Sequence, residues 1–209
     1  MDDVVIIGGG IIGVATAYFL SKEGRKVKVI EKDPTYKEAS FPLSLGGFRR
    51  QFFQKENILL GKFARDFIFQ IPELLKTKTN PNPTASMVPN GYLLMFGPEH
   101  AEQQYRALEN HKECDAGTKN IKGSELSKVF SYINDEGIET ATYTDDKSEG
   151  WIDPFMFHGA LKSKATELGA EFIKGEVKEI SEINANIIIS AAGCWTKKIL
   201  NDIPVVPQK

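Results

Sequence analysis

Residues 4–13 decide the fold, and they read VVIIGGGIIG. A continuous β-branched run such as residues 4–7 is typical of a strand that is buried on both faces of a parallel sheet. Residues 11–23 predict a helix that ends at Gly24, because glycine favours the left-handed stop of a helix. Residues 26–31 predict a second strand, because Lys26 and Lys28 alternate with Val27 and Val29. Together these elements predict a right-handed βαβ unit whose two strands are parallel neighbours.

Three glycines in this unit have the spacing G-x-G-x-x-G. Gly8 allows a tight turn out of the strand, Gly10 lets the backbone approach a pyrophosphate, and Gly13 lets the helix pack closely against the sheet. The start of the helix, where Ile11 and Ile12 lie, presents unpaired N–H groups and about half a positive charge to phosphates. The spacing therefore predicts a dinucleotide site, and a glycine-rich turn that binds nothing is the alternative.

Glu31 ends the second strand, 18 residues after Gly13. A carboxylate at this position accepts hydrogen bonds from ribose hydroxyls, and it repels a 2′-phosphate, which disfavours NADP. The motif by itself does not distinguish FAD from NAD.

Composition excludes several classes of function. The 209 residues contain 26 Lys and Arg against 28 Asp and Glu, a net charge of −2 that argues against nucleic acid or an anionic membrane as the main partner. Residues 4–21 carry no charge, but their four glycines argue against a transmembrane segment. Cys114 and Cys194 form no C-x-x-C pair and predict free thiols. The three histidines lack ligand spacing, so no metal site is predicted.

The rest of the chain contains two further groups of expected strands and helices. Residues 77–91 are rich in proline and asparagine and mark a candidate domain boundary. After this boundary we expect strands at 91–96 and 138–144, a helix at 99–114, and a short helix capped by Ser124. Asp153 and Pro154 then predict the start of a helix. Two further strands are expected at 171–174 and 187–190, and the second of them runs into a small-residue turn.

Four segments together resemble a known group of flavoproteins. They are residues 4–20, the stretch 31–52 with EK, AS and GGFRRQF, residues 149–154 (EGWIDP), and residues 188–196 (IISAAGCWT). They are similar to the family of D-amino-acid oxidase, sarcosine oxidase and dimethylglycine dehydrogenase. The resemblance implies an α/β fold with a Rossmann-like FAD/NAD(P)-binding domain built on a parallel sheet, plus part of an α+β substrate domain.

The same resemblance implies a domain division and a cofactor. Residues 1–85 and 145–209 would form a discontinuous FAD-binding domain, and residues 86–144 would form a partial substrate or cap domain. FAD is the expected cofactor, held at its pyrophosphate by the three motif glycines and at its ribose by Glu31. The further residues that the resemblance places against FAD are Lys32 (adenine), Ser40 (a phosphate or the ribityl chain), Gly46 and Gly47 (isoalloxazine), Val177 (adenine, through its backbone), and Ala191 and Gly193 (close approach of the strand end).

Ordinary structural roles are the alternatives for several of these residues. Ser40 would then be a loop hydroxyl, Val177 a core residue, and Ala191 with Gly193 a plain turn after a strand. Trp195 is predicted to be a packing residue rather than a ligand contact.

Arg49 and Arg50 lie where related enzymes place a basic residue near the flavin ring. A cation at this place stabilises the negative charge of the reduced flavin or holds a substrate carboxylate. Arg49 is the preferred catalytic candidate, and a surface pair of arginines is the alternative.

These features predict an FAD-dependent oxidoreductase that acts on CH–NH groups and passes a hydride from a small amine or amino acid to the flavin. Within the family the resemblance is strongest to a member implicated in assembling mitochondrial respiratory complex I. A non-catalytic assembly factor with respiratory-complex partners is therefore the alternative, and an NAD-dependent dehydrogenase is disfavoured. The resemblance implies a mitochondrial location; because no targeting segment is recognised, a cytoplasmic one is the alternative.

The sequence departs from the family pattern in two places. Only residues 178–186 separate Val177 from Ile187 at the start of the last expected strand, which is shorter than the family's hairpin. The chain also stops at residues 204–209, where the family's chain crosses into the second half of its substrate domain. The expectation is a truncated chain with exposed sheet edges, weak flavin binding and no turnover.

Overall fold

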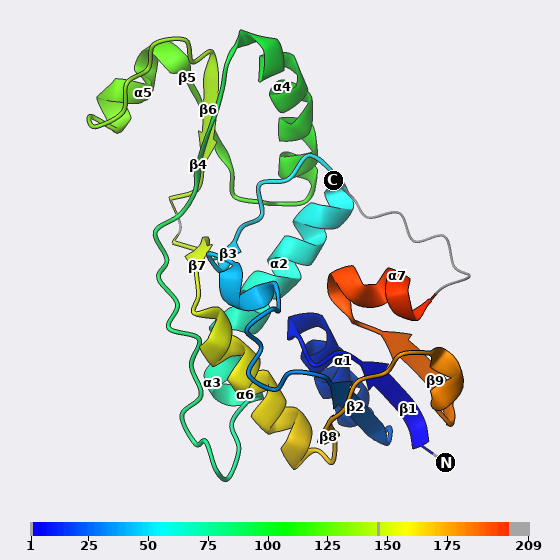
Figure 1. Ribbon diagram of the computed structural model, residues 1–209. Helices are drawn as coiled ribbons and strands as arrows, with labels where there is room; N and C mark the ends of the chain where they lie inside the picture. Colours follow the sequence, from blue (N-terminus) through cyan, green and yellow to red (C-terminus); the bar gives the residue numbers. More distant parts are fainter. Residues whose placement is uncertain (1, 146, 201–209) are drawn as a thin grey trace. The chain divides into compact units, whose positions relative to one another are not determined.

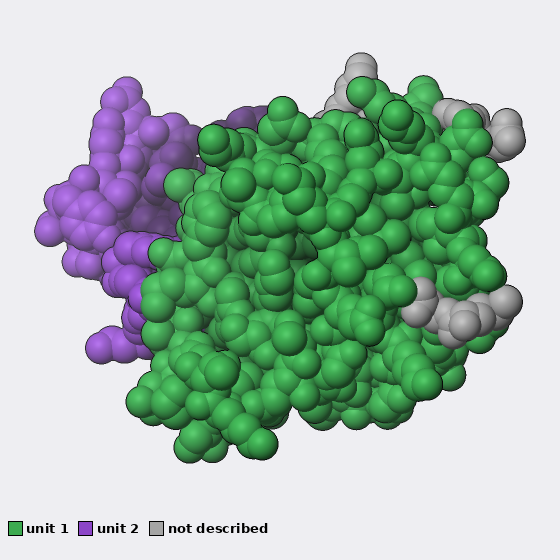
Figure 2. Space-filling view, turned by 60° about the horizontal axis from the view of Figure 1, so that its bottom comes forward, with its two compact units in different colours: residues 1–45, 71–85, 153–209 green, residues 46–70, 86–152 purple. Residues whose placement is uncertain are grey.

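The computed structural model describes residues 2–145 and 147–200. The chain divides into two compact units (Figure 2). Unit 1 comprises Met1–Leu45, Ile71–Ala85 and Asp153–Lys209, and unit 2 comprises Gly46–Gln70 and Ser86–Ile152.

Unit 1 is built on a four-stranded sheet in the order β8-β2-β1-β9, in which all neighbours are parallel (Figure 1). The strands are β1 (Asp2–Ile7), β2 (Val27–Glu31), β8 (Glu171–Lys174) and β9 (Ala185–Ser190). Val4, Val5, Ile6 and Ile7 of the central strand are all buried. This confirms that the β-branched run is a strand covered on both faces.

Two helices of unit 1 lie in the connections that lead to strands of this sheet. Helix α1 (Ile11–Lys22) joins β1 to β2, and α6 (Pro154–Glu167) packs against α1. Both helices are followed by a glycine with positive φ, +78° at Gly24 and +101° at Gly169. The Asp153 carboxylate caps α6 by accepting from the Met156 N–H at 2.9 Å, as the Asp-Pro pair predicts. Short elements complete this unit: η1 (Phe41–Leu43), α3 (Ile71–Leu74), η2 (Ile180–Glu182), η3 (Gly193–Trp195) and α7 (Thr196–Ile199).

In its described residues, unit 2 consists of two antiparallel sheets and three helices. Its main sheet has the order β4-β6-β5, formed by β4 (Leu93–Phe96), β6 (Thr140–Tyr143) and β5 (Lys119–Lys122). Two short strands, β3 (Gly47–Phe48) and β7 (Gly150–Trp151), also pair antiparallel. The helices are α2 (Lys55–Phe69), α4 (Pro98–Glu113) and α5 (Gly123–Val129).

The division into units differs from the expected domains at 46–70 and 145–152, which lie in unit 2. The β3–β7 ladder is the physical reason, because it joins residues about 100 positions apart by hydrogen bonds. Helix α2 follows this ladder and contacts α4 and β3 of the same unit.

The expected cap of the short helix is wrong. Helix α5 begins at Gly123, its N-cap is Lys122, and no side chain caps it. A Cβ at Gly123 would lie 1.7 Å from the Ile138 carbonyl oxygen, so only glycine fits at the first position of this helix. Strand β5, which is polar and lacks a hydrophobic alternation, was not expected from the sequence.

Candidate functional site

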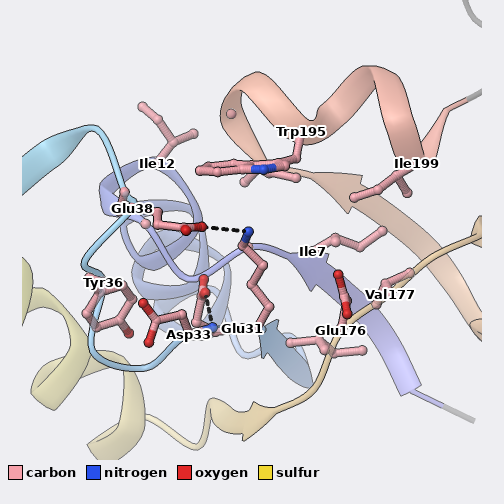
Figure 3. A pocket seen from close by; sticks show the side chains of 18 of the residues that line it. Ile7, Ile12, Glu31, Asp33, Tyr36, Glu38, Glu176, Val177, Trp195 and Ile199 are labelled. Carbon is pink, nitrogen blue, oxygen red and sulfur yellow. Dashed lines mark hydrogen bonds and ion pairs between the residues drawn. The ribbon is translucent and has the colours of Figure 1, made fainter.

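A cavity of about 460 Å³ opens at the carboxyl ends of β1, β2 and β9 in unit 1 (Figure 3). Strand β1 lies between β2 and β9: the chain goes from β1 to β2 on one side and returns, after β8, to β9 on the other side, so the strand order reverses at β1. Ligands of open α/β sheets bind at such a switch point. Ten of the predicted site residues line the cavity: Gly8, Gly10, Ile11, Ile12, Glu31, Lys32, Ser40, Val177, Ala191 and Gly193.

The three motif glycines are required for different reasons. Gly8 has φ +100°, and a Cβ there would lie 2.6 Å from the Ala191 carbonyl oxygen. A Cβ at Gly13 would lie 1.9 Å from the Gly8 carbonyl oxygen, so the turn and the first turn of α1 touch through their backbones. Gly10 is different, because its φ is −64° and a Cβ there meets no atom within 4 Å. Packing within the chain therefore explains Gly8 and Gly13, whereas Gly10 borders open space in the cavity.

The Glu31 carboxylate is held by main-chain groups at the end of β2. Its Oε2 accepts from the Gly9 N–H at 2.6 Å, and its Oε1 accepts from the Asp33 N–H at 2.7 Å. Each carboxylate oxygen can accept a further bond, so the group remains able to bind hydroxyls in the cavity. The site is thus suited to a sugar next to the glycine turn.

Lys32 and Trp195 form one wall of the cavity. The Lys32 ammonium lies over the indole of Trp195, with Nζ 3.9 Å from the ring centroid. Lys32 also pairs with Glu38 at 3.2 Å. Trp195 is half-buried and lines the cavity rather than a packed core, which the sequence analysis missed. Its position two residues after Gly193, on the turn that follows β9, was the signal that could have revealed it.

His158 lies under the glycine turn. Its Nε2 is 2.8 Å from the Gly9 carbonyl oxygen, and the side chain is only 4% exposed. The ring stacks on Phe41 at 4.5 Å and meets Tyr36 edge-on at 4.6 Å. Burial lowers the pKa of His158 below its ordinary value of 6.5, so the neutral imidazole is favoured.

Comparison with known proteins identifies the family. Residues 3–209 match the family model DAO, described as FAD dependent oxidoreductase. The chain belongs to the DAO family. It is 32% identical to FAD-dependent oxidoreductase domain-containing protein 1 of Xenopus laevis, over 94% of this chain and 47% of that protein. The Bos taurus protein of the same name is also 32% identical, over 98% of this chain and 43% of its own length. The chain thus spans about half the length of these curated relatives.

A solved structure confirms the fold class of this DAO-family chain. L-proline dehydrogenase from P. horikoshii superposes with a TM-score of 0.77 at 26% identity, covering 96% of this chain and 55% of that one. The α/β, Rossmann-like architecture expected from residues 4–31 is therefore confirmed.

Three residues predicted to lie near the flavin ring, Gly46, Gly47 and Arg49, belong to unit 2 of the DAO-family chain. Gly46 has φ +67°, and Gly47 lies on β3. The Arg49 guanidinium lies 4.9 Å from the Phe52 ring centroid and 5.8 Å from that of Tyr92. Their roles toward a flavin stay predictions.

A second cavity, of about 340 Å³, lies within unit 2. Gln51, 3% exposed, lines it and donates from Nε2 to Glu149 Oε2 at 2.8 Å and to the Tyr92 carbonyl oxygen at 3.1 Å. Both partners accept only, so Oε1 of Gln51 is left as a hydrogen-bond acceptor. His111, also 3% exposed, donates from Nε2 to the Phe52 carbonyl oxygen at 2.7 Å, which leaves Nδ1 as an acceptor.

Within the described part of the chain, three residues that line the second cavity carry a polar atom without a hydrogen-bond partner. Among the described residues, Gln51 Oε1, His111 Nδ1 and Arg49 Nε are buried and find no hydrogen-bond partner. The lining of the cavity is mainly apolar, from Phe52, Phe53, Leu93, Leu94, Met95 and Phe96, and its polar members are Arg49, Gln51, Gln104 and His111. This mixed lining suits a small molecule with an apolar part and a few polar groups.

No metal site or membrane span is found in the part of the chain that the structure describes. Within it, no three His, Cys, Asp or Glu side chains are grouped so that they could hold a metal ion. None of its helices is long and apolar enough to span a bilayer.

Acidification should destabilise the DAO-family chain below about pH 6.5. Burial lowers the pKa of both His111 and His158 in the folded state, whereas the unfolded chain titrates them at the ordinary value. Below that value the unfolded state binds more protons, so the free energy of unfolding falls as the pH falls. Urea unfolding of the wild type and of the double variant H111Q/H158Q at pH 7.5 and pH 5.5 measures the effect. If the free energy of unfolding of the double variant depended on pH as strongly as that of the wild type, the two histidines would not be the cause of the effect.

Proposed function

We propose that this chain binds FAD in its unit 1 cavity and is part of an oxidoreductase that acts on a small amine or amino acid. The observation that carries the proposal is the open space beside Gly10. Gly8 and Gly13 are needed by the packing of the chain itself, but a Cβ at Gly10 would meet no protein atom. Glycine at position 10 is explained if a ligand lies close to the backbone of this residue.

The cavity residues fit the adenosine diphosphate half of FAD. The N–H groups at the start of α1, at Ile11 and Ile12, would face the pyrophosphate together with the positive end of the helix dipole. Glu31, fixed by two main-chain N–H groups, would accept the ribose hydroxyls. The remaining groups proposed to contact the dinucleotide are Lys32 and Trp195 on one wall, Ser40 on the loop before η1, and Val177, Ala191 and Gly193 at the ends of the neighbouring strands.

FAD, when bound, supplies the hydride acceptor. The chain's own residues would bind and orient the dinucleotide, and the unit 2 cavity would take the substrate. Its lining includes Arg49, a cation of the kind that pairs with a carboxylate, among mainly apolar side chains. The likeness to an L-proline dehydrogenase supports an amino acid as the substrate. A mitochondrial location, implied by the family resemblance, belongs to the same proposal and is tested by cell fractionation.

The variant E31A tests the cofactor site. Hydrogen bonds to a charged group contribute about 1.5–3 kcal/mol, so loss of the carboxylate should weaken FAD binding by about tenfold to 100-fold. Flavin retained after gel filtration and flavin fluorescence titrations measure the effect. The matched control is E171A, because Glu171 lies at the opposite end of the same sheet and is exposed. Unchanged FAD affinity in E31A, or a wild-type chain that binds no flavin, would show the proposal to be wrong.

Anaerobic reduction tests the oxidoreductase role. Sarcosine, dimethylglycine, a D-amino acid and L-proline are the probes, and bleaching of the bound flavin by any of them supports amine oxidation. Flavin that stays bound and oxidised with all four probes contradicts the amine-oxidising part of the proposal. That result would favour the non-catalytic role in assembling a respiratory complex.

A further inference from the structure

Two side chains hold the middle glycine of the nucleotide-binding turn. The Gly9 N–H donates to Glu31 at 2.6 Å, and the Gly9 carbonyl oxygen lies 2.8 Å from Nε2 of His158. A carbonyl oxygen only accepts, so His158 Nε2 carries the proton and donates it. The motif accounts for Glu31, whereas His158 comes from α6, 149 residues further along the chain.

The bond from His158 determines where the next N–H points. The Gly9 carbonyl and the Gly10 N–H belong to one planar trans peptide, so the two groups point in opposite directions. Holding the carbonyl toward α6 therefore directs the Gly10 N–H away from α6. In residues 2–145 and 147–200 the Gly10 N–H has no acceptor, and Gly10 lines the cavity.

The imidazole has little freedom to leave this position. Phe41 stacks on it with an interplanar angle of 9°, and Tyr36 closes another side at 66°. The charged groups that face it are Lys162, whose Nζ bonds the Tyr36 hydroxyl at 3.1 Å, and Glu31. Fixed donors of this kind preorganise a site, because the binding step then costs little conformational entropy.

We propose that His158 is a positioning residue of the cofactor site: by holding the Gly9 carbonyl it aims the Gly10 N–H at the FAD pyrophosphate. This inference rests on the proposed function, because it assigns the cavity to FAD. It assigns a role to a residue outside the G-x-G-x-x-G motif and its acidic partner.

The test compares H158Q with H158M, with ADP as the probe. Glutamine and methionine have nearly the same shape, but only glutamine has an N–H that can donate to the Gly9 carbonyl. We expect H158M to bind ADP about tenfold more weakly than the wild type, and H158Q to stay within about threefold. In 15N–1H spectra, ADP should shift the Gly10 amide in the wild type and H158Q, and less in H158M. Thermal unfolding of both variants separates a loss of stability from this effect.

Matched variants on the same helix serve as controls. Lys164 of α6 also donates to a backbone carbonyl, that of Lys76, at 2.8 Å, and it lies outside the cavity. K164Q and K164M should bind ADP like the wild type within about twofold. H158L provides a second variant without a donor if H158M does not fold.

The outcomes separate this inference from the proposed function. A wild-type chain that binds neither ADP nor FAD overturns both. A wild-type chain that binds ADP, together with H158M and H158L that bind it equally well, overturns the role of His158 alone. The same holds if H158Q is as weak as H158M at equal thermal stability.

Discussion

Replacing Gly10 with alanine is expected to weaken FAD binding by about 100-fold or more while the chain stays folded. The new methyl group would meet no protein atom within 4 Å, and φ at this residue is −64°, which alanine adopts without strain. The methyl group would instead occupy the space into which the pyrophosphate is proposed to come. FAD titration followed by flavin fluorescence measures the affinity, and urea unfolding of the cofactor-free chain measures the stability.

The stability of G10A is expected to change little, because two small effects oppose each other. Alanine lowers the entropy of the unfolded chain, but it is a poorer N-cap than glycine. Full flavin binding by a folded G10A chain would show that no ligand approaches Gly10, and the proposed function would lose its main support.

Replacing Gly13 with alanine is expected to lower the stability of the fold itself, in contrast to G10A, which is expected to lower FAD affinity. A Cβ there would lie 1.9 Å from the Gly8 carbonyl oxygen and 3.4 Å from the Ala191 Cβ, so α1 would have to move away from the turn. Because backbone atoms cannot rotate aside as a side chain does, we expect a loss of about 3 kcal/mol in the free energy of unfolding. Urea or thermal unfolding of the cofactor-free chain measures this loss.

Gly159 provides the matched control for Gly13. It also lies in a helix of unit 1, but a Cβ there meets no atom within 4 Å. G159A should raise the free energy of unfolding by about 0.5–1 kcal/mol, because glycine is a poor residue for a helix interior. Equal stabilities of G13A and G159A would contradict the close backbone contact between α1 and the turn.

The residues around the glycine turn of the candidate site could be located from the sequence because their signals are local. Residues 4–13 contain a strand, a glycine turn and the start of a helix within ten positions, and Glu31 follows at the end of the next strand. Each of these features depends on backbone geometry that a short sequence specifies. Val177, Ala191 and Gly193 were reached only through resemblance, because nothing in their own pattern shows that β8 and β9 lie beside β2 and β1.

The role of His158 could not be predicted from its neighbours in the sequence. Its pattern on α6 is that of a buried helix face, and only the packing of α6 against α1 brings it to the Gly9 carbonyl. The same is true of the second cavity, where Gln51 is oriented by Glu149 about 100 residues away. Such contacts depend on which elements meet, and a periodic pattern does not contain that information.

Residues 4–31 were therefore enough to predict the βαβ unit, its parallel pairing and the acidic residue at the end of the second strand. The tertiary structure decided which residues form the cavity wall, that Trp195 is one of them, and that residues 47–48 pair with residues 150–151. The physical reason is the range of the interactions. Turns, caps and strand propensities act over a few residues, whereas hydrogen bonds such as that between His158 and Gly9 form only after distant segments have packed together.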